Sequence, residues 1–264
     1  MKDNDRTALH ARVPHVLPGV RNVDKTPTSL LIQYSPREIA AQITILTSHV
    51  HHYLTGPELI GQRWNTEEAV FIPNFIQYRD FFSQVNNWVS YAIVSEGDLE
   101  RRSLNLAAMI FVCDELHKMR NWDMLVAVYG GLRDPSVERL HHTWSSLPRD
   151  VIEVSTKLQN LLNPDAGYKT LKDIMREGKR PQFPCIAVFI EDLVELESEK
   201  NSQQGFVNFG RCLQQYQLLQ YLLLGRDMRV SHLVRNDYLM GSFSFWDPVD
   251  SSVLMELSNR IEGN

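Results

Sequence analysis

The chain has 264 residues, enough for one large domain or two small ones with a substantial buried core. Its hydrophobic share of 43% and charged share of 22% are those of an ordinary globular protein and exclude a disordered or fibrous chain. The net charge of −5, without any run of lysine or arginine, disfavours nucleic acid as a partner.

Residues 1–34 contain Pro14, Pro18 and Pro27 and show little periodicity, which predicts an extended or disordered N-terminal arm. The first residues lack the apolar stretch of a signal peptide. The most apolar stretch of the chain, residues 218–224, is too short to span a bilayer.

Helical signals begin at residue 35. Ser35, Pro36 and Glu38 combine an N-cap serine, a proline at the first helical position and a glutamate that can close a capping box, which predicts a helix start. Apolar residues then recur every three or four positions over residues 75–92, so one face of a second helix is expected to pack on the core. The next predicted helix, residues 99–117, is apolar nearly all round and is expected to be the central axis of the domain.

The rest of the chain also has mainly helical patterns. A helix is predicted over residues 123–129, ended by Gly130-Gly131, and Pro135 begins a short one. Three more are predicted near residues 168–176, 185–199 and 207–224. The alternation of Phe243-Ser244-Phe245 is typical of a very short strand. We therefore predict an all-α fold, with residues 35–264 as a single multi-helix domain.

Conventional catalytic and cofactor motifs are missing from the sequence. It has neither a P-loop nor a glycine-rich dinucleotide fingerprint, so we expect no bound nucleotide and no cofactor. The histidines of residues 49–52 would point to different faces of a helix, which is typical of exposed or partly buried helix residues rather than a metal site. Cys113, Cys185 and Cys212 have no pairable spacing, which favours reduced thiols in a cytoplasmic protein.

Several motifs follow one another in a characteristic order. Three of them lie close together: Glu100-Arg101-Arg102, Arg120-Asn121-Trp122 and Arg139-Leu140-His141-His142-Thr143-Trp144. Others lie before and after these three: residues 35–44, 58–64, 75–89 and 184–201, and Val207-Asn208-Phe209. In order and spacing, the segments of residues 35–225 resemble the Cdc25-homology (RasGEF) catalytic domain of guanine-nucleotide exchange factors for Ras-family small GTPases.

This resemblance implies a protruding helical hairpin on the all-α domain, and a groove for the switch 2 segment of the GTPase. It implies an exchange factor that binds a Ras-family small GTPase, opens its switch regions with the hairpin and promotes GDP release and GTP loading. No covalent bond is made or broken in such a reaction. Such a factor would prefer the nucleotide-free GTPase. Because the coupling between the two binding events is reciprocal, incoming GTP would in turn weaken the complex and eject the factor.

The groove-lining positions implied by the resemblance come from two helices and from the segments after them: Asp80, Ser83, Val126, Gly130, Arg133, Glu138 and Tyr168. Arg133 stands where the family commonly has a small amide, and Glu138 where an aromatic residue or histidine is frequent. These two departures leave the choice of GTPase, whether Ras, Rap, Ral or another, undetermined.

The resemblance implies that the first hairpin helix displaces switch 1 and the magnesium and phosphate groups of the GTPase. Its positions are an apolar residue followed by carboxylates and a serine: Val194, Glu195, Glu197, Ser198 and Glu199. Ser198 aligns with a glutamate found in some members, whereas a one-residue shift would give that place to Glu199. The charge pattern by itself is also that of a solvated helix face.

The returning hairpin helix is expected to begin at Val207-Asn208-Phe209 and to pack on the core through Phe209, Leu213 and Tyr216. On the same helix, Gln214 stands where some relatives have a lysine that contacts the GTPase. The remaining motif positions are assigned to packing and helix ends: Asn121, Trp122, Arg139, Thr143, Trp144, Asn208 and Phe209.

One alternative is an exchange-inactive module of the same fold that binds a GTPase or an adaptor. The altered positions Arg133 and Glu138 would permit it, as would Cys185-Ile186-Ala187, where the family usually has Pro-Phe-Phe-Gly or a similar sequence. An unrelated helical scaffold of the solenoid type would require a repeat, and no repeat is visible.

The sequence has neither a lipidation motif nor a basic amphipathic helix, so we expect no direct membrane insertion. Recruitment to the membrane face where its GTPase resides would then depend on a partner or on flanking regulatory domains. The arm of residues 1–34 is too short for the helical module that usually precedes this domain in the family. This suggests an excised catalytic fragment or a member whose exchange domain stands alone.

Overall fold

The computed structural model describes residues 27–177, 181–200, 202–203, 206–243 and 248–263. Its α-helices are α2 (Pro27–Gln33), α3 (Pro36–Tyr53), α4 (Pro73–Val94), α5 (Leu99–Lys118), α6 (Trp122–Leu132), α7 (Pro135–Glu138), α8 (His141–Ser145), α9 (Arg149–Leu161), α10 (Lys169–Glu177), α11 (Ile186–Ser198), α12 (Phe209–Leu222), α13 (Asp237–Phe243) and α14 (Ser251–Ile261). Short 3-10 helices are η2 (Gly56–Leu59), η3 (Arg63–Asn65), η4 (Glu67–Phe71) and η5 (Leu223–Asp227). Within the described ranges, the only strands are β1 (Ser202–Gln203) and β2 (Phe206–Val207), which pair antiparallel. The predicted all-α fold is confirmed.

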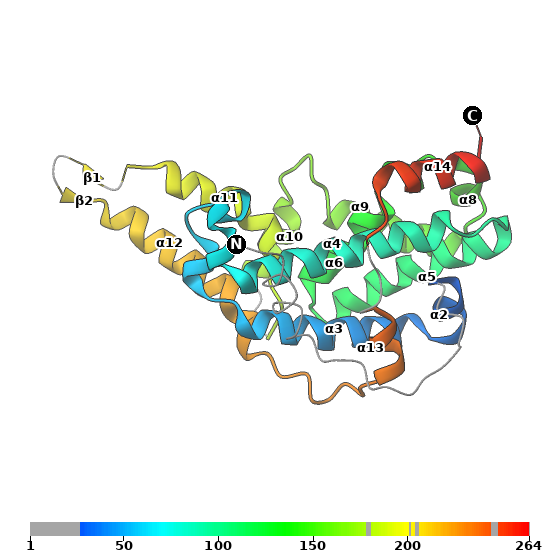
Figure 1. Ribbon diagram of the computed structural model, residues 1–264, viewed down its shortest axis with the longest axis horizontal. Coiled ribbons are helices and arrows are strands. Elements are labelled where there is room, and N and C mark those ends of the chain that lie inside the picture. The colour runs from blue at the N-terminus through cyan, green and yellow to red at the C-terminus, as the bar shows by residue number, and fades with distance from the viewer. Residues whose placement is uncertain (1–26, 178–180, 201, 204–205, 244–247, 264) are drawn as a thin grey trace, which may run out of the picture.

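The helices form an elongated body with one long projection (Figure 1). Helices α3, α4, α5 and α6 make up the body, and α11 and α12 extend away from one end of it as a hairpin, with β1 and β2 at its tip. The C-terminal helix α14 lies near α8 at the opposite end. The hairpin is thus the part of the fold that protrudes farthest from the core.

The predicted helix start at Ser35 and the predicted central axis are confirmed. Glu38 donates its backbone N–H to the Ser35 hydroxyl at 3.3 Å, and its carboxylate accepts the Ser35 N–H at 2.8 Å, so the capping box is closed. Helix α5 packs against α3, α4, α6, α8 and α9, as an all-round apolar helix must. Its side chains Leu106, Met109 and Val112 are fully buried.

The prediction that Gly130-Gly131 ends a helix is wrong, because α6 continues through both glycines to Leu132. Their function is to let α4 and α6 approach each other closely. A Cβ atom at Gly131 would lie 2.4 Å from the Asn86 carbonyl oxygen, and one at Gly130 would lie 2.5 Å from the Asn86 amide nitrogen. The two glycines therefore set the distance between the helices that carry the implied groove residues.

Part of the predicted N-terminal arm is helical. Residues 27–33 form α2, whose Leu30 and Leu31 are buried, and which packs against α4 and α5. The prediction of an extended or disordered segment is therefore wrong for these residues, because an apolar pair ties them to the core. Residues 1–26 lie outside the described residues.

The predicted short strand over Phe243-Ser244-Phe245 is wrong at its first residue, which ends helix α13. Ser244 and Phe245 lie outside the described residues. The last predicted helix, 207–224, begins two residues later than expected, because Phe206–Val207 pairs with β1 at the hairpin tip.

Candidate functional site

The base of the hairpin is fixed to the junction between α5 and α6. The backbone N–H of Phe183 donates to the Arg120 carbonyl at 3.1 Å, and the Trp122 N–H donates to the Phe183 carbonyl at 3.1 Å. Cys185, which directly precedes α11, is buried. The hairpin thus leaves the body from a short backbone bridge rather than from a free loop.

Helix α10 braces the first hairpin helix through Asp192. The Lys172 ammonium lies 2.6 Å from one Asp192 oxygen, and the Arg176 guanidinium lies 3.2 Å from the other. Arg176 also stacks over the Phe189 ring, 5.3 Å from its centroid. Asp192 is therefore engaged within the protein.

The structure brings together some of the predicted hairpin residues. Glu195 and Glu199 are exposed and, with Gln214 of α12, line a hollow of about 540 Å³ between α10, α11 and α12. Val194 is half-buried on α11. The hollow therefore presents Glu195 and Glu199, beside the ion-paired Asp192 and Arg176, to any molecule that approaches the hairpin.

The side chains of Ser198 and Glu197, unlike that of Glu195, form short hydrogen bonds within the part of the chain that the structure describes. The Ser198 hydroxyl donates to the Glu195 carbonyl at 2.7 Å, at the last residue of α11, and Glu199 lies just beyond the helix end. The two alternatives for the aligned acidic position, Ser198 and Glu199, thus lie on either side of this helix end. Glu197 accepts a hydrogen bond from the Gly61 N–H at 2.7 Å.

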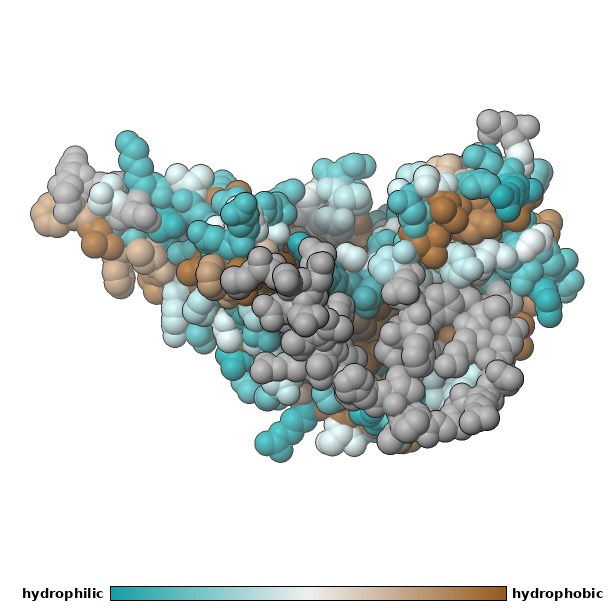
Figure 2. All heavy atoms as spheres, in the orientation of Figure 1, coloured by the Kyte–Doolittle hydropathy of each residue, from teal (hydrophilic) through white to brown (hydrophobic). Residues whose placement is uncertain are grey.

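The expected packing of the returning helix on the core is wrong. Phe209 is 73% exposed, Tyr216 59% and Leu213 43%, because α12 projects beyond the body and buries fully only Leu222 near its C-terminal end. Figure 2 shows hydrophobic side chains gathered along α12 on the projecting hairpin. Asn208 is the N-cap of α12, since its side-chain oxygen accepts the Arg211 N–H at 3.1 Å.

The implied groove residues lie on helices that pack side by side. Asp80 and Ser83 are exposed on α4, and Val126 is half-buried on α6, the main packing partner of α4. Asp80 forms an ion pair at 3.2 Å with its exposed neighbour Arg79. Gly130, which accommodates Asn86 of α4, joins these positions to the end of α6.

Arg133 and Glu138 are brought into direct contact. The Arg133 guanidinium lies 2.5 Å from a Glu138 carboxylate oxygen, and both side chains are partly exposed. They stand at a hollow of about 630 Å³ whose lining includes Leu132, Trp144 and Leu147. Arg133 and Glu138, two of the positions at which this sequence departs from the resemblance, therefore form one self-neutralising pair beside a hollow with a mixed polar and apolar lining.

Tyr168 has an unusual backbone conformation. Its φ of 55° places it in the left-handed region, directly after Gly167 with φ of 59°. The ring is half-buried, and burial, followed by the charges of Cys185 and Glu191, raises the pKa of its hydroxyl. Tyr168 thus remains a neutral hydrogen-bonding group close to the base of the hairpin.

Asn121 and Trp122 are buried and hydrogen-bonded within the protein. Asn121 is fully buried, accepts the Met124 N–H at 3.1 Å as the N-cap of α6, and donates to the hydroxyls of Thr44 and Thr47. The indole of Trp122 donates to the Gln182 side chain at 2.9 Å. Both residues position the start of α6 and the hairpin base.

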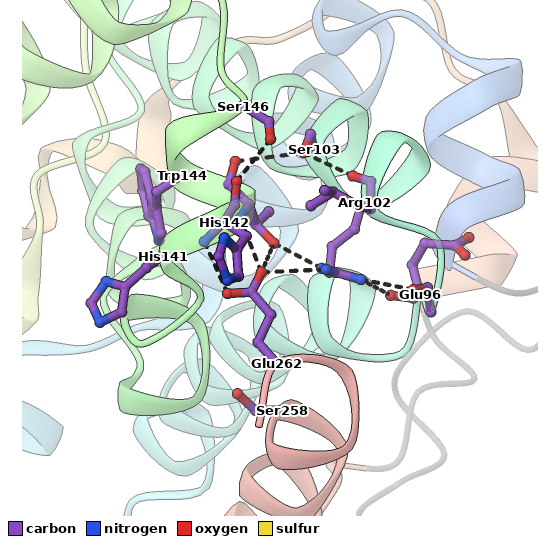
Figure 3. Close-up of polar contacts among 12 residues, drawn as sticks. Glu96, Arg102, Ser103, His141, His142, Trp144, Ser146, Ser258 and Glu262 are labelled. Carbon is purple, nitrogen blue, oxygen red and sulfur yellow. Dashed lines mark hydrogen bonds and ion pairs between the residues drawn. The ribbon is translucent and has the colours of Figure 1, made fainter. Parts of the chain in front are cut away.

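The motif of residues 139–144 holds the C-terminal helix (Figure 3). The Glu262 carboxylate accepts the N–H groups of His142 and Thr143, each at 3.0 Å, and the Thr143 hydroxyl at 2.6 Å. Arg102 donates to Thr143 at 2.8 Å and lies 3.3 Å from Glu262, and Arg139 donates to the Glu262 carbonyl at 2.8 Å. Trp144 donates its indole N–H to the Val137 carbonyl at 3.0 Å.

The sequence did not predict a buried polar cluster that lies near the hairpin base. His51 lies 2.9 Å from one Asp123 oxygen, and the Tyr78 hydroxyl donates to the other at 2.6 Å, with all three side chains buried. The prediction that His51 is an exposed or partly buried residue is wrong, because Asp123 supplies the buried partner it needs. Burial, followed by Asp123, raises the pKa of Tyr78 well above its ordinary value.

Two absences concern only the part of the chain that the structure describes. No three histidine, cysteine, aspartate or glutamate side chains there are placed to hold a metal ion. None of the helices there combines the length and the apolar character needed to cross a membrane.

Comparison with known proteins identifies the family. Residues 38–213 match the family described as RasGEF domain. The chain is 28% identical to Ras guanine nucleotide exchange factor M of Dictyostelium discoideum over 183 residues, which are 67% of this chain and 20% of that protein. It is 26% identical to Ras guanine nucleotide exchange factor B of the same organism over 247 residues, 89% of this chain and 16% of that protein.

The chain thus spans a fifth or less of the length of these two relatives. The family match covers more than half of the chain, and it includes the helices of the body, all of α11 and the start of α12. It also agrees with the all-α body and its projecting hairpin (Figure 1). This chain belongs to the RasGEF domain family.

Proposed function

We propose that this chain is a guanine-nucleotide exchange factor for a Ras-family small GTPase. It binds the GTPase, opens its switch regions with the α11–α12 hairpin and promotes GDP release and GTP loading, without any covalent step. The observation that carries this proposal is the projecting hairpin on a body that belongs to the RasGEF family. The names of the two relatives compared above, both Ras guanine nucleotide exchange factors, agree with it.

The exposed surface of the hairpin supports a partner of this kind. Phe206, Val207 and Phe209 are each more than two thirds exposed near its tip, which is typical of a surface that another protein covers. Glu195 and Glu199 place negative charge on the same hairpin, where it can compete with nucleotide phosphates for positive groups on a GTPase. Apolar and acidic groups together suit displacement of a metal-bound, phosphate-containing ligand.

The second contact surface of the proposal is the groove on α4 and α6. Asp80, Ser83 and Val126 would face the switch 2 segment, and the Arg133–Glu138 pair would lie at the end of α6. Gly130 would line the same groove, and Glu138 and Tyr168 would complete its edge. Gln214, in the hairpin hollow, would offer an amide to the GTPase in place of a charged amine.

The preference for the nucleotide-free GTPase belongs to the same proposal. A picomolar nucleotide affinity corresponds to about −16 kcal/mol, so spontaneous release is slow and the factor must weaken that binding. Linkage then requires that nucleotide weakens the complex by the same factor.

We also propose that the protein acts in the cytoplasm and reaches the membrane face of its GTPase through a partner or a flanking domain. Strong sedimentation of the isolated chain with lipid vesicles would contradict it.

The proposed activity is tested by release of fluorescent GDP from a panel of Ras, Rap and Ral proteins. The chain is expected to accelerate release from at least one of them in the presence of excess GTP. Each GTPase without the chain gives the spontaneous rate, and EDTA-stimulated release gives the positive control. If no GTPase responds, retention of a nucleotide-free GTPase on the immobilised chain would instead favour the exchange-inactive binding module.

A further inference from the structure

Glu197 joins the hairpin to a turn of the body. Its carboxylate accepts the Gly61 N–H at 2.7 Å and the side-chain amide of Gln62 at 3.4 Å. The Gln215 amide of α12 donates to the same carboxylate at 3.4 Å. A single side chain of α11 therefore contacts both the second hairpin helix and a segment that precedes α4.

The turn that meets Glu197 has an uncommon backbone. Gly61 has φ of 79° and Gln62 has φ of 50°, so two consecutive residues lie in the left-handed region. This conformation is easily reached by glycine, but it is costly for glutamine unless neighbouring contacts hold it. The charge-assisted hydrogen bond from the Gly61 N–H to Glu197 is such a contact.

The segment that leads into this turn is hydrogen-bonded to the start of α4. Glu58 is buried, and its carboxylate accepts the Asn74 N–H at 2.9 Å in the first turn of α4 and the Thr55 N–H at 3.1 Å. Glu197 is therefore linked to α4 through the Gly61 hydrogen bond, the short backbone segment of residues 58–61 and the hydrogen bonds of Glu58 to Asn74. Helix α4 carries Asp80 and Ser83 of the proposed groove.

We propose that Glu197 is a positioning residue that sets the tilt of the hairpin relative to α4, and so the separation of the two proposed GTPase-contacting surfaces. It does this by holding the turn of residues 61–62, and it does not face the metal and phosphate groups of the GTPase. The effect on exchange rests on the proposed function, whereas the effect on hairpin position does not. Glu195 and Glu199, which line the open hollow, remain the carboxylates available to a partner.

Hairpin position can be measured in the free protein by the distance between two spin labels. Cys212, the exposed cysteine of α12, takes one label, and a Ser83→Cys substitution on α4 takes the other. Cys113 and Cys185 are buried, and burial raises the pKa of both thiols, so they react poorly.

Glu197→Ala is expected to broaden and shift the distance distribution, because the turn loses its acceptor. Glu197→Gln keeps an oxygen that can accept the Gly61 N–H, so its distribution is expected to stay close to that of the unsubstituted chain. Glu191→Ala removes an exposed carboxylate elsewhere on α11 and is the matched control, with no change expected. A Glu197→Ala distribution identical to that of the control would overturn the proposal.

Exchange kinetics then separate positioning from direct contact. For a responding GTPase, Glu197→Ala is expected to lower the maximal exchange rate about tenfold or more, as misplacement of a contacting group does. Glu197→Gln is expected to retain most of that rate, although its charge is gone. Equal losses in both variants, with unchanged label distances, would show that Glu197 acts directly on the GTPase. If no GTPase responds, the label distances alone decide the role of Glu197.

Discussion

Replacement of Glu262 by alanine is expected to lower the free energy of unfolding by about 3 kcal/mol, because it leaves the buried Arg102 without its charged partner. It also removes the acceptor for the N–H groups of His142 and Thr143 at the start of α8. Urea unfolding followed by circular dichroism measures the loss. The circular dichroism spectrum of the folded variant should match that of the unsubstituted chain, since the helices themselves do not depend on this residue.

Glu256→Ala is the matched control for this variant. Glu256 lies on the same helix, α14, but its carboxylate is exposed and pairs with the exposed Arg260, so a change within about 0.5 kcal/mol is expected. Should both variants lose the same small amount, the network around Glu262 would not be what holds α14 to the body.

The Glu262 contribution is expected to depend on pH. Burial alone would raise the pKa of the Glu262 carboxyl, but hydrogen bonds from Thr143, from the backbone of residues 142–143 and from Arg102 outweigh it, so the pKa lies below the ordinary 4.5. A carboxyl with a lowered pKa in the folded state stabilises the fold fully above the ordinary value. The difference between the unsubstituted chain and Glu262→Ala should therefore shrink as the pH falls below about 4.5 towards the lowered value.

Arg133→Glu is expected to weaken binding to the GTPase about tenfold to a hundredfold, because it places a like charge beside Glu138 at the end of the proposed groove. The folded state should be nearly unaffected, since an exposed ion pair contributes about 0–1 kcal/mol. Exchange rates measured over a range of GTPase concentrations give the binding effect, and the melting temperature gives the stability effect. Unchanged exchange in this variant would refute the placement of the site.

A charge swap separates the two roles of this pair. In the Arg133→Glu, Glu138→Arg double variant, the internal ion pair is restored with its direction reversed. If the GTPase contacts the positive charge at position 133 directly, the double variant should still bind the GTPase weakly. Full recovery would instead mean that the pair only holds the segment between α6 and α7, and that the contact with the GTPase lies elsewhere.

Helices with local signals were predictable from the sequence. The capping box at Ser35 and the all-round apolar pattern of α5 depend on residues close together in the chain, so the fold class and the axis of the body followed from them. The role of Gly130-Gly131 did not, because glycine ends a helix in one context and admits a neighbouring helix in another. Only the position of Asn86 on α4 distinguishes the two.

The candidate site was predictable only in part. The motifs located the hairpin, but the apolar spacing of Phe209, Leu213 and Tyr216 could not reveal that this face of α12 meets solvent instead of core. The partners of Thr143 and His51 are Glu262 and Asp123, far away in the chain. No local periodicity encodes such pairs, since they arise only when the body has assembled.

The backbone bridge at the hairpin base bears on the order in which the chain folds. Phe183 pairs with Arg120 and Trp122, so the bridge closes a long loop and forms only after the end of α5 and the start of α6 are in place. During synthesis, α3 to α6 leave the ribosome before α11 does, so the platform for the hairpin is available when the hairpin appears. In the finished protein, α12 buries little of its length and can open locally while the body stays folded.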